Sequence, residues 1–194
     1  RNSALCIATK CDQLECCKEI IKRCPALLYH QDNFRWSVLH QAAYKKNYRL
    51  IDFFVSAGLE AAKSEGGTES MICFKKWINL QNESGDTALV VAVMGRGCHD
   101  IVKRFAEVDH HYKLGLCEIV CSNNKTALQW AMHYQYNEVI KMLTDDGNFP
   151  ISIAIEEAQG FLQTGNSSGN GTGGNNTYYC DICFPLHYHA STNL

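Results

Sequence analysis

Residues 37–43 read SVLHQAA and are the best copy of a seven-residue pattern that the chain contains four times. The other copies are SALCIAT at residues 3–9, TALVVAV at residues 87–93 and TALQWAM at residues 126–132. Each copy begins with a serine or threonine, whose hydroxyl can cap the N-terminus of a helix. Each then carries a leucine and, three positions later, an alanine, which lie on one helix face and let a second helix approach closely. Self-similarity of this kind predicts a repeat protein.

The leucines of the four copies set the spacing of the repeats: Leu5, Leu39, Leu89 and Leu128. Neighbouring leucines are 34, 50 and 39 residues apart, so the first interval is close to one helix-turn-helix repeat and the other two require insertions. A second segment with apolar residues three or four apart follows each copy, at residues 14–21, 48–55, 100–105 and 137–143. This spacing predicts a second helix with one buried stripe, and we expect the four leucines to share one continuous core.

These residues resemble the ankyrin repeat, whose unit is a β-turn, a helix opening Thr-Pro-Leu-His-x-Ala-Ala, a second helix of Ile-Val-x-x-Leu-Leu type and a closing glycine. The resemblance covers about residues 1–148. It implies an all-α fold, an ankyrin-repeat solenoid of antiparallel helix pairs with short β-turn or hairpin loops. The four implied repeats span about residues 1–28, 29–78, 79–120 and 121–150.

The chain departs from the family pattern at several positions. No proline follows the four hydroxyl residues, and only His40 keeps the motif histidine, which by the resemblance braces adjacent turns through hydrogen bonds. The turn glycine is kept as Gly85, is Asn124 in repeat four, which tolerates a positive φ, and is Arg35 in repeat two. We expect two second helices to close in the left-handed conformation at a glycine: Gly58 and Gly147.

The first insertion covers about residues 60–77. It begins with polar and glycine residues and turns apolar at residues 71–74 and 77–78. Because a loop of this length without structure is unusual inside a compact domain, we expect the apolar half to pack against the array and the glycines to stay mobile. Two interpretations stay open, a family-specific elaboration without function and a partner-binding element.

The second insertion covers about residues 107–122 and is rich in histidine and cysteine. Together with two residues upstream it offers six candidate metal ligands: Cys98, His99, His110, His111, Cys117 and Cys121. Their spacing matches no compact zinc module, and an apolar pair separates the last two cysteines. We therefore favour cysteines packed in the core and a histidine pair in solvent.

Composition and charge narrow the class of protein. The net charge of −2 gives no whole-chain attraction to nucleic acid or to an anionic membrane, so we expect no direct nucleic-acid binding by the repeats. The longest apolar run, residues 88–94, is far too short to span a bilayer. The 11 cysteines are not spaced as a secreted disulfide framework, which favours thiols in a reducing compartment. We predict an intracellular, cytoplasmic protein, with the nucleus as an alternative.

Three segments follow the repeats. Residues 151–163 predict one more helix, which would cap the exposed end of the stack and extend the array to residues 1–163. Residues 164–177 are nearly all Gly, Asn, Ser and Thr and predict a flexible linker. Residues 178–194 begin YYCDIC, which resembles the start of a two-cysteine, two-histidine zinc finger.

The tail places four candidate zinc ligands close together: Cys180, Cys183, His187 and His189. In the resembled family two histidines follow on a helix, and the chain ends before that place. Four interpretations stay open: a truncated finger, a tight local zinc site, a RING-type opening, and an ordered docking segment without metal. Zinc is therefore a candidate cofactor and not an assigned one.

No catalytic constellation is visible in the sequence, which lacks a phosphate loop, a nucleophile elbow and an HExxH motif. We predict a non-catalytic module that binds another protein or a peptide through its concave surface. One alternative is a targeting or substrate-recruiting arm of a larger zinc-finger, nucleic-acid-binding or ubiquitin-ligase protein. Another is the cytosolic ankyrin domain of a membrane protein.

The ankyrin resemblance implies that partner-binding residues lie at the turn tips and on the exposed face of each first helix. Carried onto this chain, these positions are Asn33, Phe34, Trp36, Tyr44, Lys45, Glu83, Ser84, Asp86, Met94, Ser122, Lys125, His133 and Tyr134. The aromatic residues among them are suitable anchors, because binding hot spots favour large aromatic side chains. Packing against the neighbouring turn is the competing interpretation for each of them.

Overall fold

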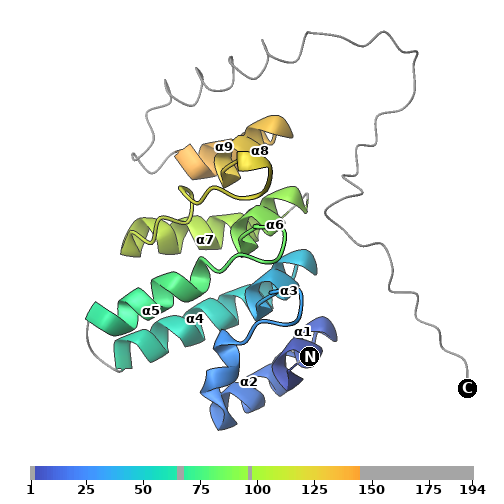
Figure 1. Ribbon diagram of the computed structural model, residues 1–194, viewed down its shortest axis with the longest axis vertical. Helices are drawn as coiled ribbons and strands as arrows, with labels where there is room; N and C mark the ends of the chain where they lie inside the picture. The colour runs from blue at the N-terminus through green and yellow to red at the C-terminus, as the bar shows by residue number, and fades with distance from the viewer. Residues whose placement is uncertain (1–2, 65–67, 96–97, 145–194) are drawn as a thin grey trace, which may run out of the picture.

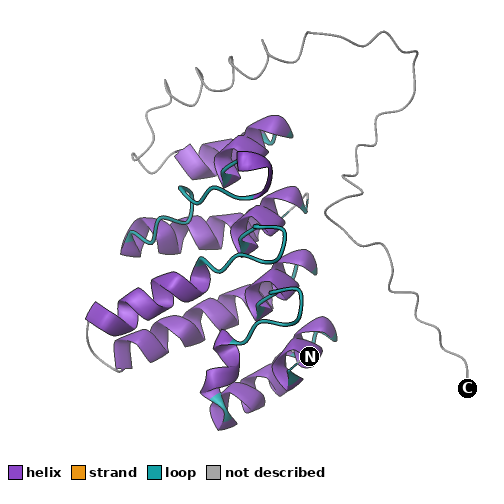
Figure 2. Cartoon of the chain, in the orientation of Figure 1, coloured by secondary structure: helices purple, strands orange, loops and turns teal. Residues whose placement is uncertain are grey.

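A computed structural model describes residues 3–64, 68–95 and 98–144 of the chain, and most of these residues are helical (Figures 1 and 2). The α-helices are α1 (Ala4–Lys10), α2 (Leu14–Arg23), α3 (Val38–Tyr44), α4 (Tyr48–Ser64), α5 (Thr68–Ile78), α6 (Ala88–Met94), α7 (His99–Tyr112), α8 (Ala127–His133) and α9 (Asn137–Thr144). Two short 3₁₀ helices are η1 (Pro25–Tyr29) and η2 (Ser122–Asn124).

The helices stack as pairs in two layers. Figure 1 shows the short helices α1, α3, α6 and α8 following one another along the stack, each paired with one of α2, α4, α7 and α9. The short helices contact one another in sequence, and α7 bridges α4 and α9 in the second layer. The predicted all-α solenoid of helix pairs is confirmed.

Hydroxyl caps start all four short helices, as the seven-residue pattern predicts. The side chain of each capping residue accepts a hydrogen bond from the backbone N–H three residues later, in the pairs Ser3–Cys6, Ser37–His40, Thr87–Val90 and Thr126–Gln129. Each bond satisfies one of the N–H groups that a helix start leaves unpaired. The serine or threonine therefore fixes where each short helix begins.

The loops between helix pairs end in tight turns of one repeated form. In each turn a backbone N–H donates to the carbonyl four residues later, from Asp32 to Trp36, from Asn82 to Asp86 and from Cys121 to Lys125. The residue before the last in each turn has a positive φ: Arg35 at 58°, Gly85 at 84° and Asn124 at 57°. The expected conformations of Gly85 and Asn124 are therefore confirmed, and Arg35 adopts the same left-handed conformation without the freedom of glycine.

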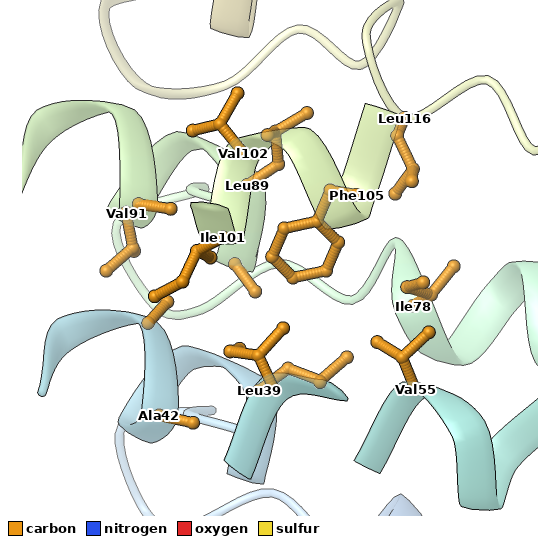
Figure 3. Packing of buried hydrophobic residues seen from close by; sticks show 14 of the residues in the cluster. Leu39, Ala42, Val55, Ile78, Leu89, Val91, Ile101, Val102, Phe105 and Leu116 are labelled. Atoms are coloured by element: carbon orange, nitrogen blue, oxygen red, sulfur yellow. The ribbon is translucent and has the colours of Figure 1, made fainter. Parts of the chain in front are cut away.

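One buried core runs through the stack. The four motif leucines, Leu5, Leu39, Leu89 and Leu128, are all buried and belong to the same hydrophobic cluster, as predicted. Figure 3 shows its middle, where Leu89 of α6 and Phe105 of α7 lie between Leu39 of α3 below and Leu116 of the following loop. Each pair thus buries its apolar face against its neighbours.

Gly58 does not end a helix, and that prediction is wrong. α4 continues through Gly58 to Ser64, and a Cβ atom at position 58 would lie 2.6 Å from Cζ3 of Trp77. Glycine is needed here because the indole of Trp77 packs directly onto the backbone of α4. The same indole donates from Nε1 to the carbonyl of Leu28 at 2.9 Å, which ties α5 to the preceding pair.

The first insertion forms a helix instead of a loop. Its apolar half is α5, whose Phe74, Trp77 and Ile78 are buried, so the expected packing against the array is confirmed. Residues 65–67, which contain the insertion's glycines, lie outside the described residues. The second insertion is half helical, because α7 continues to Tyr112 and ends at Lys113 in the left-handed conformation.

Left-handed residues also mark the turn inside three helix pairs. Asp12, Lys46 and Gln135 have φ values of 57°, 56° and 57°, and each lies nine residues after a capping hydroxyl. None of them is a glycine, so the sequence offered no sign of this turn. Gly147, the expected capping helix, the linker and the tail with Cys180, Cys183, His187 and His189 all lie outside the described residues.

Candidate functional site

The turn tips form a ladder of hydrogen bonds along one side of the stack. The backbone N–H of Glu83 donates to the carbonyl of Phe34 at 3.0 Å. The Gln81 amide Nε2 donates to the carbonyl of Val120 at 2.9 Å, and that of Gln31 donates to the carbonyl of Gln81 at 3.3 Å. Because each tip is bonded to the next, the exposed side chains between these bonds are held on a fixed frame.

His40 connects α3 to the next tip. Its Nε2 lies 2.9 Å from the carbonyl oxygen of Asp86, which can only accept, so Nε2 carries the hydrogen. Its Nδ1 accepts from the backbone N–H of Ser37 at 3.2 Å, which completes a capping box. Burial lowers the pKa of the His40 imidazole to about 4, so the ring is neutral at pH 7. These bonds give His40 the bracing role that the resemblance implies.

Asp86 continues this connection and is not an accessible binding residue, which corrects that part of the expected surface. It is only 3% exposed, its N–H donates to Asn82 Oδ1 at 3.0 Å, and its Oδ1 accepts from the N–H of Ser122 at 3.2 Å. Burial raises the pKa of the Asp86 carboxyl. Asp86 therefore joins the tips that flank α6, with His40 on one side and Ser122 on the other.

The remaining expected binding residues differ in accessibility. Seven are exposed: Asn33, Phe34, Tyr44, Lys45, Glu83, Ser84 and His133. Five are half-buried: Trp36, Met94, Ser122, Lys125 and Tyr134. Whether these residues contact a partner stays a prediction, and their exposure shows only that twelve of the thirteen present some surface.

Aromatic side chains gather along α3. The Trp36 ring lies 5.7 Å from the Tyr44 ring in an edge-to-face arrangement and 5.9 Å from the His40 ring. Trp36 therefore packs along α3 and also presents some surface, and its contact with a partner stays a prediction. Phe34 and Tyr44 are 59% and 49% exposed, and Tyr48 at the start of α4 is 42% exposed. Sequence reasoning missed Tyr48.

A second aromatic group lies at α8. Lys125 Nζ lies 4.7 Å above the Trp130 ring, Trp130 stacks on Tyr134 at 5.6 Å, and Tyr134 stacks on Tyr136 at 5.4 Å. His133 meets the Trp130 ring edge-on at 5.7 Å, and burial followed by the charge of Lys125 lowers its pKa. Most of this group is packed against itself, which leaves less free aromatic surface than at α3.

The candidate metal ligands of the second insertion do not converge. Cys98 and Cys121 are buried in the core, Cys117 is half-buried, and His110 and His111 are exposed. Among the residues that the structure describes, no group of three or more His, Cys, Asp or Glu side chains could hold a metal ion. The described helices also include none that is long and apolar enough to cross a membrane.

Comparison with known proteins identifies the repeats. A family model described as Ankyrin repeats (3 copies) matches residues 59–154. Protein ACCELERATED CELL DEATH 6 of Arabidopsis thaliana is 36% identical over 98 residues, which are 49% of this chain and 14% of that protein. Residues 59–154 of this chain therefore match the ankyrin-repeat family. The chain spans only a small part of this relative, so nothing about the whole relative transfers directly.

Solved structures show the same fold. A chain from the complex of yeast ribosomal protein Rps3 with its chaperone Yar1 has a TM-score of 0.60 at 19% identity, covering 74% of this chain and 91% of that one. A chain from the complex of the Bd0816 predatory endopeptidase of Bdellovibrio bacteriovorus with immunity protein Bd3460 has a TM-score of 0.52 at 20% identity, covering 74% and 64%. At such identities the likeness establishes the ankyrin-repeat solenoid and nothing more.

The number of ankyrin repeats needs a correction. The comparison supports three repeats, whereas the sequence pattern predicted four. Four helix pairs are present in the described part of the chain, but the matched residues begin inside α4. The insertion of α5 places 50 residues between Leu39 and Leu89, which interrupts the regular ankyrin spacing at that point. The resemblance of the tail to a zinc finger receives no support from these comparisons.

Proposed function

We propose that this chain is a non-catalytic protein-binding module that holds a partner protein or peptide on its loop side. The loop side comprises the turn tips at residues 32–36, 82–86 and 121–125 and the C-terminal ends of α3, α6 and α8. Ankyrin repeats are typically protein-protein interaction modules, and both similar structures are complexes with partner proteins. Repeat stacks of this kind expose an extended surface suited to that purpose.

The observation that carries the proposal is the exposure of Phe34 and Tyr44 on a braced frame. Burying a large apolar side chain against a partner removes its surface from water, which lowers the free energy of the complex. Such side chains are therefore favoured anchors at interfaces. The bonds of the Phe34 and Asp86 carbonyls fix the tip beneath them. A partner therefore meets side chains that are already positioned, and binding costs little ordering entropy.

The nearest approach to a catalytic pair in the described residues is Ser37 with His40, and it is unsuited to catalysis. Ser37 Oγ lies 2.8 Å from His40 Nδ1, but both side chains are only 1% exposed. The hydroxyl also accepts the capping bond from the His40 N–H, and Nε2 is bonded to a carbonyl. A substrate would have no route to this pair, so we assign it to structure.

The cysteines support a reducing compartment. Those in the described residues are free thiols, and Cys11, Cys16, Cys24 and Cys73 are exposed without forming disulfides. Several exposed thiols in one small domain would oxidise readily outside the cell. The cytoplasmic assignment remains our proposal, and the number and spacing of the 11 cysteines in the sequence support it.

The experiment is a selection of short random peptides, displayed on phage, against the immobilised full chain. Binding of the selected peptides is then measured to three proteins: the unmodified chain, a loop-side variant with Phe34→Ala and Tyr44→Ala, and a control variant with Tyr29→Ala and Ile72→Ala. The control removes one exposed aromatic and one exposed aliphatic side chain away from the tips. Thermal unfolding checks that all three proteins are folded.

We expect the loop-side variant to lose about tenfold or more in affinity and the control variant to stay within about twofold. Loss of binding to both variants, or to the control alone, would show that the peptides use another surface and would contradict the proposal. Selection of no peptide above background would contradict it as well.

A further inference from the structure

We propose that the α3 patch recognises an acidic segment of the partner that also carries aromatic or aliphatic residues. The α3 patch is defined by eight side chains: Phe34, Arg35, Trp36, Tyr44, Lys45, Lys46, Tyr48 and Arg49. This inference rests on the proposed protein-binding function and adds the chemistry of the partner.

The charge of this stretch differs from that of the whole chain. Residues 33–49 contain four cationic side chains and no Asp or Glu, whereas the chain has a net charge of −2. The cationic residues Arg35, Lys45, Lys46 and Arg49 are all exposed, and none forms an ion pair with another described residue. The patch therefore concentrates positive charge that the fold itself does not neutralise.

The carboxylates next to the patch are already engaged. Asp32 is buried, accepts from the N–H groups of Phe34 and Trp36 at 3.0 Å each, and lies 3.6 Å from Lys10 Nζ. The side chain of Asp12 accepts from the Asn47 amide. These bonds commit Asp32 to its own tip and to Lys10, whereas Asp12 lines the same depression as Lys45, Lys46 and Arg49 without forming an ion pair with any of them. The four cations of the patch therefore outnumber the two carboxylates beside them.

Shape and apolar surface accompany the charge. A shallow depression of about 390 Å³ lies between the α1–α2 and α3–α4 turns, and its lining is Asp12, Leu14, Lys45, Lys46, Asn47, Tyr48 and Arg49. Three of the seven exposed large hydrophobic side chains in the described residues belong to the patch, namely Phe34, Tyr44 and Tyr48. Cations alternate with aromatic rings over a short distance, which matches a segment that alternates carboxylates with apolar side chains.

A nucleic acid fits these observations less well. Duplex and single-strand binding sites rely on cations that follow the phosphate backbone, commonly about six to ten contacts for a tight complex. Beyond the α3 patch the loop side offers the exposed Glu83 and His133 and the half-buried Met94, and its Lys125 lies over the Trp130 ring. Burial and the nearby Lys125 lower the pKa of His133, so its imidazole carries less positive charge than an ordinary histidine. The positive track stops after one helix pair, which suits a peptide contact and not an extended strand.

The test uses the same peptide selection and asks which peptides are enriched. Their binding is measured to the unmodified chain, to a charge-reversed variant with Lys45→Glu, Lys46→Glu and Arg49→Glu, and to a matched control. The control reverses three exposed lysines on second helices, with Lys22→Glu, Lys103→Glu and Lys141→Glu, so the net charge change is similar. A neutral variant with Lys45→Gln, Lys46→Gln and Arg49→Gln replaces the charge-reversed one if that protein fails to fold.

We expect enriched peptides to be net negative and to contain aromatic or aliphatic residues. Charge reversal of the patch should weaken their binding by about tenfold or more, whereas the control substitutions should weaken it by less than about threefold. Binding to the unmodified chain should also weaken as the salt concentration rises from about 50 to about 300 mM. Neutral or basic peptides that still depend on Phe34 and Tyr44 would overturn this inference and leave the proposed function standing. Equal losses in the patch and control variants would overturn it too.

One further probe separates the macromolecule classes. A uridine-rich single-stranded RNA is titrated against the same proteins under the same salt conditions. We expect it to bind at least about tenfold more weakly than the acidic peptides. If the RNA binds more tightly than the peptides and loses binding on charge reversal, the patch is a nucleic-acid site and the inference is wrong.

Discussion

The pairs α3–α4 and α6–α7 use the same capping pattern and differ in what it supports. In α6 the six residues from Ala88 to Val93 are apolar and all buried, so this helix serves as core between its neighbours. In α3 the equivalent interior holds His40 and Gln41, which are buried and polar, and the helix ends in exposed Tyr44 and Lys45. The α6–α7 pair therefore contributes mainly to the stability of the core, whereas the α3–α4 pair also presents an exposed surface.

The largest expected effect of a single substitution on stability lies in the pair α6–α7, which we call the core pair. Leu89→Ala removes a fully buried side chain of the common core and should cost about 2–5 kcal/mol of unfolding free energy. Tyr44→Ala in the other pair should cost less than about 1 kcal/mol, because its ring is half exposed. Urea unfolding monitored by circular dichroism measures both. Similar losses for the two variants would remove the division between a core pair and a surface pair.

The polar interior of α3 should make stability depend on pH. Burial lowers the pKa of His40 from 6.5 to about 4, so below pH 6.5 the unfolded chain takes up a proton that the folded chain refuses. The stability from neutral His40 is present above pH 6.5 and is lost as the pH falls toward 4, by on the order of 3 kcal/mol in full. The core pair has Val90 at this position, whose side chain does not titrate, so this position adds no pH dependence to the stability of that pair.

Urea unfolding at several pH values between about 7 and 4.5 tests this expectation. In the His40→Gln variant, the unfolding free energy should fall less steeply with decreasing pH, because the imidazole no longer contributes. The same dependence on pH in both proteins would contradict the role of His40. The raised pKa of Asp86 acts with the opposite sign, because protonation relieves the cost of a buried carboxylate as the pH falls. Asp86→Asn should therefore steepen the loss on the acidic side.

Much of this architecture could be predicted because its causes are local. The hydroxyl caps, the leucine positions and the tip conformations of Gly85 and Asn124 each depend on a few neighbouring residues. The failures depended on contacts between distant residues. Gly58 resembles a helix end until Trp77 is placed on it, and Asp86 resembles a surface residue until the Ser122 N–H reaches it.

The candidate surface was predictable in outline and not in its charge. Phe34, Trp36 and Tyr44 followed from the repeat pattern, whereas Lys46, Tyr48 and Arg49 lie just beyond the positions that the pattern marks. One signal was available in the sequence, namely the absence of any carboxylate from residues 33–49. The fold pairs Asp12 with Asn47 and Asp32 with Lys10, and neither carboxylate forms an ion pair with the cations of the patch. The sequence alone does not reveal these partners.

A further difference between the pairs is the added helix α5, which packs mainly on α4. Gly58→Ala places a methyl group 2.6 Å from the Trp77 ring and should cost about 1–3 kcal/mol. Combining it with Trp77→Leu removes the obstacle, so the cost of Gly58→Ala in that background should fall below about 0.5 kcal/mol. An additive double mutant, measured by urea unfolding, would show that the close contact does not explain the glycine.

The smallest expected effect on stability concerns the turn tips that contain Arg35 and Gly85. Gly85 and Arg35 occupy the same turn position with φ values of 84° and 58°, but only glycine adopts such values without steric cost. Arg35→Asn should therefore stabilise the fold by about 0.5 kcal/mol, since asparagine tolerates this conformation and already occupies it at Asn124. Arg35→Gly should gain less, because glycine also increases the entropy of the unfolded chain.

The same substitution separates stability from binding. If Arg35 is retained at a strained position because its charge serves the α3 patch, then Arg35→Asn should raise the unfolding free energy while lowering affinity for acidic peptides by about twofold to fivefold. Gly85→Asn is the matched change at the core pair's tip. It should cost a few tenths of a kcal/mol, roughly the preference for glycine over asparagine at a positive φ, and leave peptide affinity unchanged. A stabilised Arg35→Asn protein with full affinity would mean that the strain at this tip serves no contact, and the two tips would then differ in sequence alone.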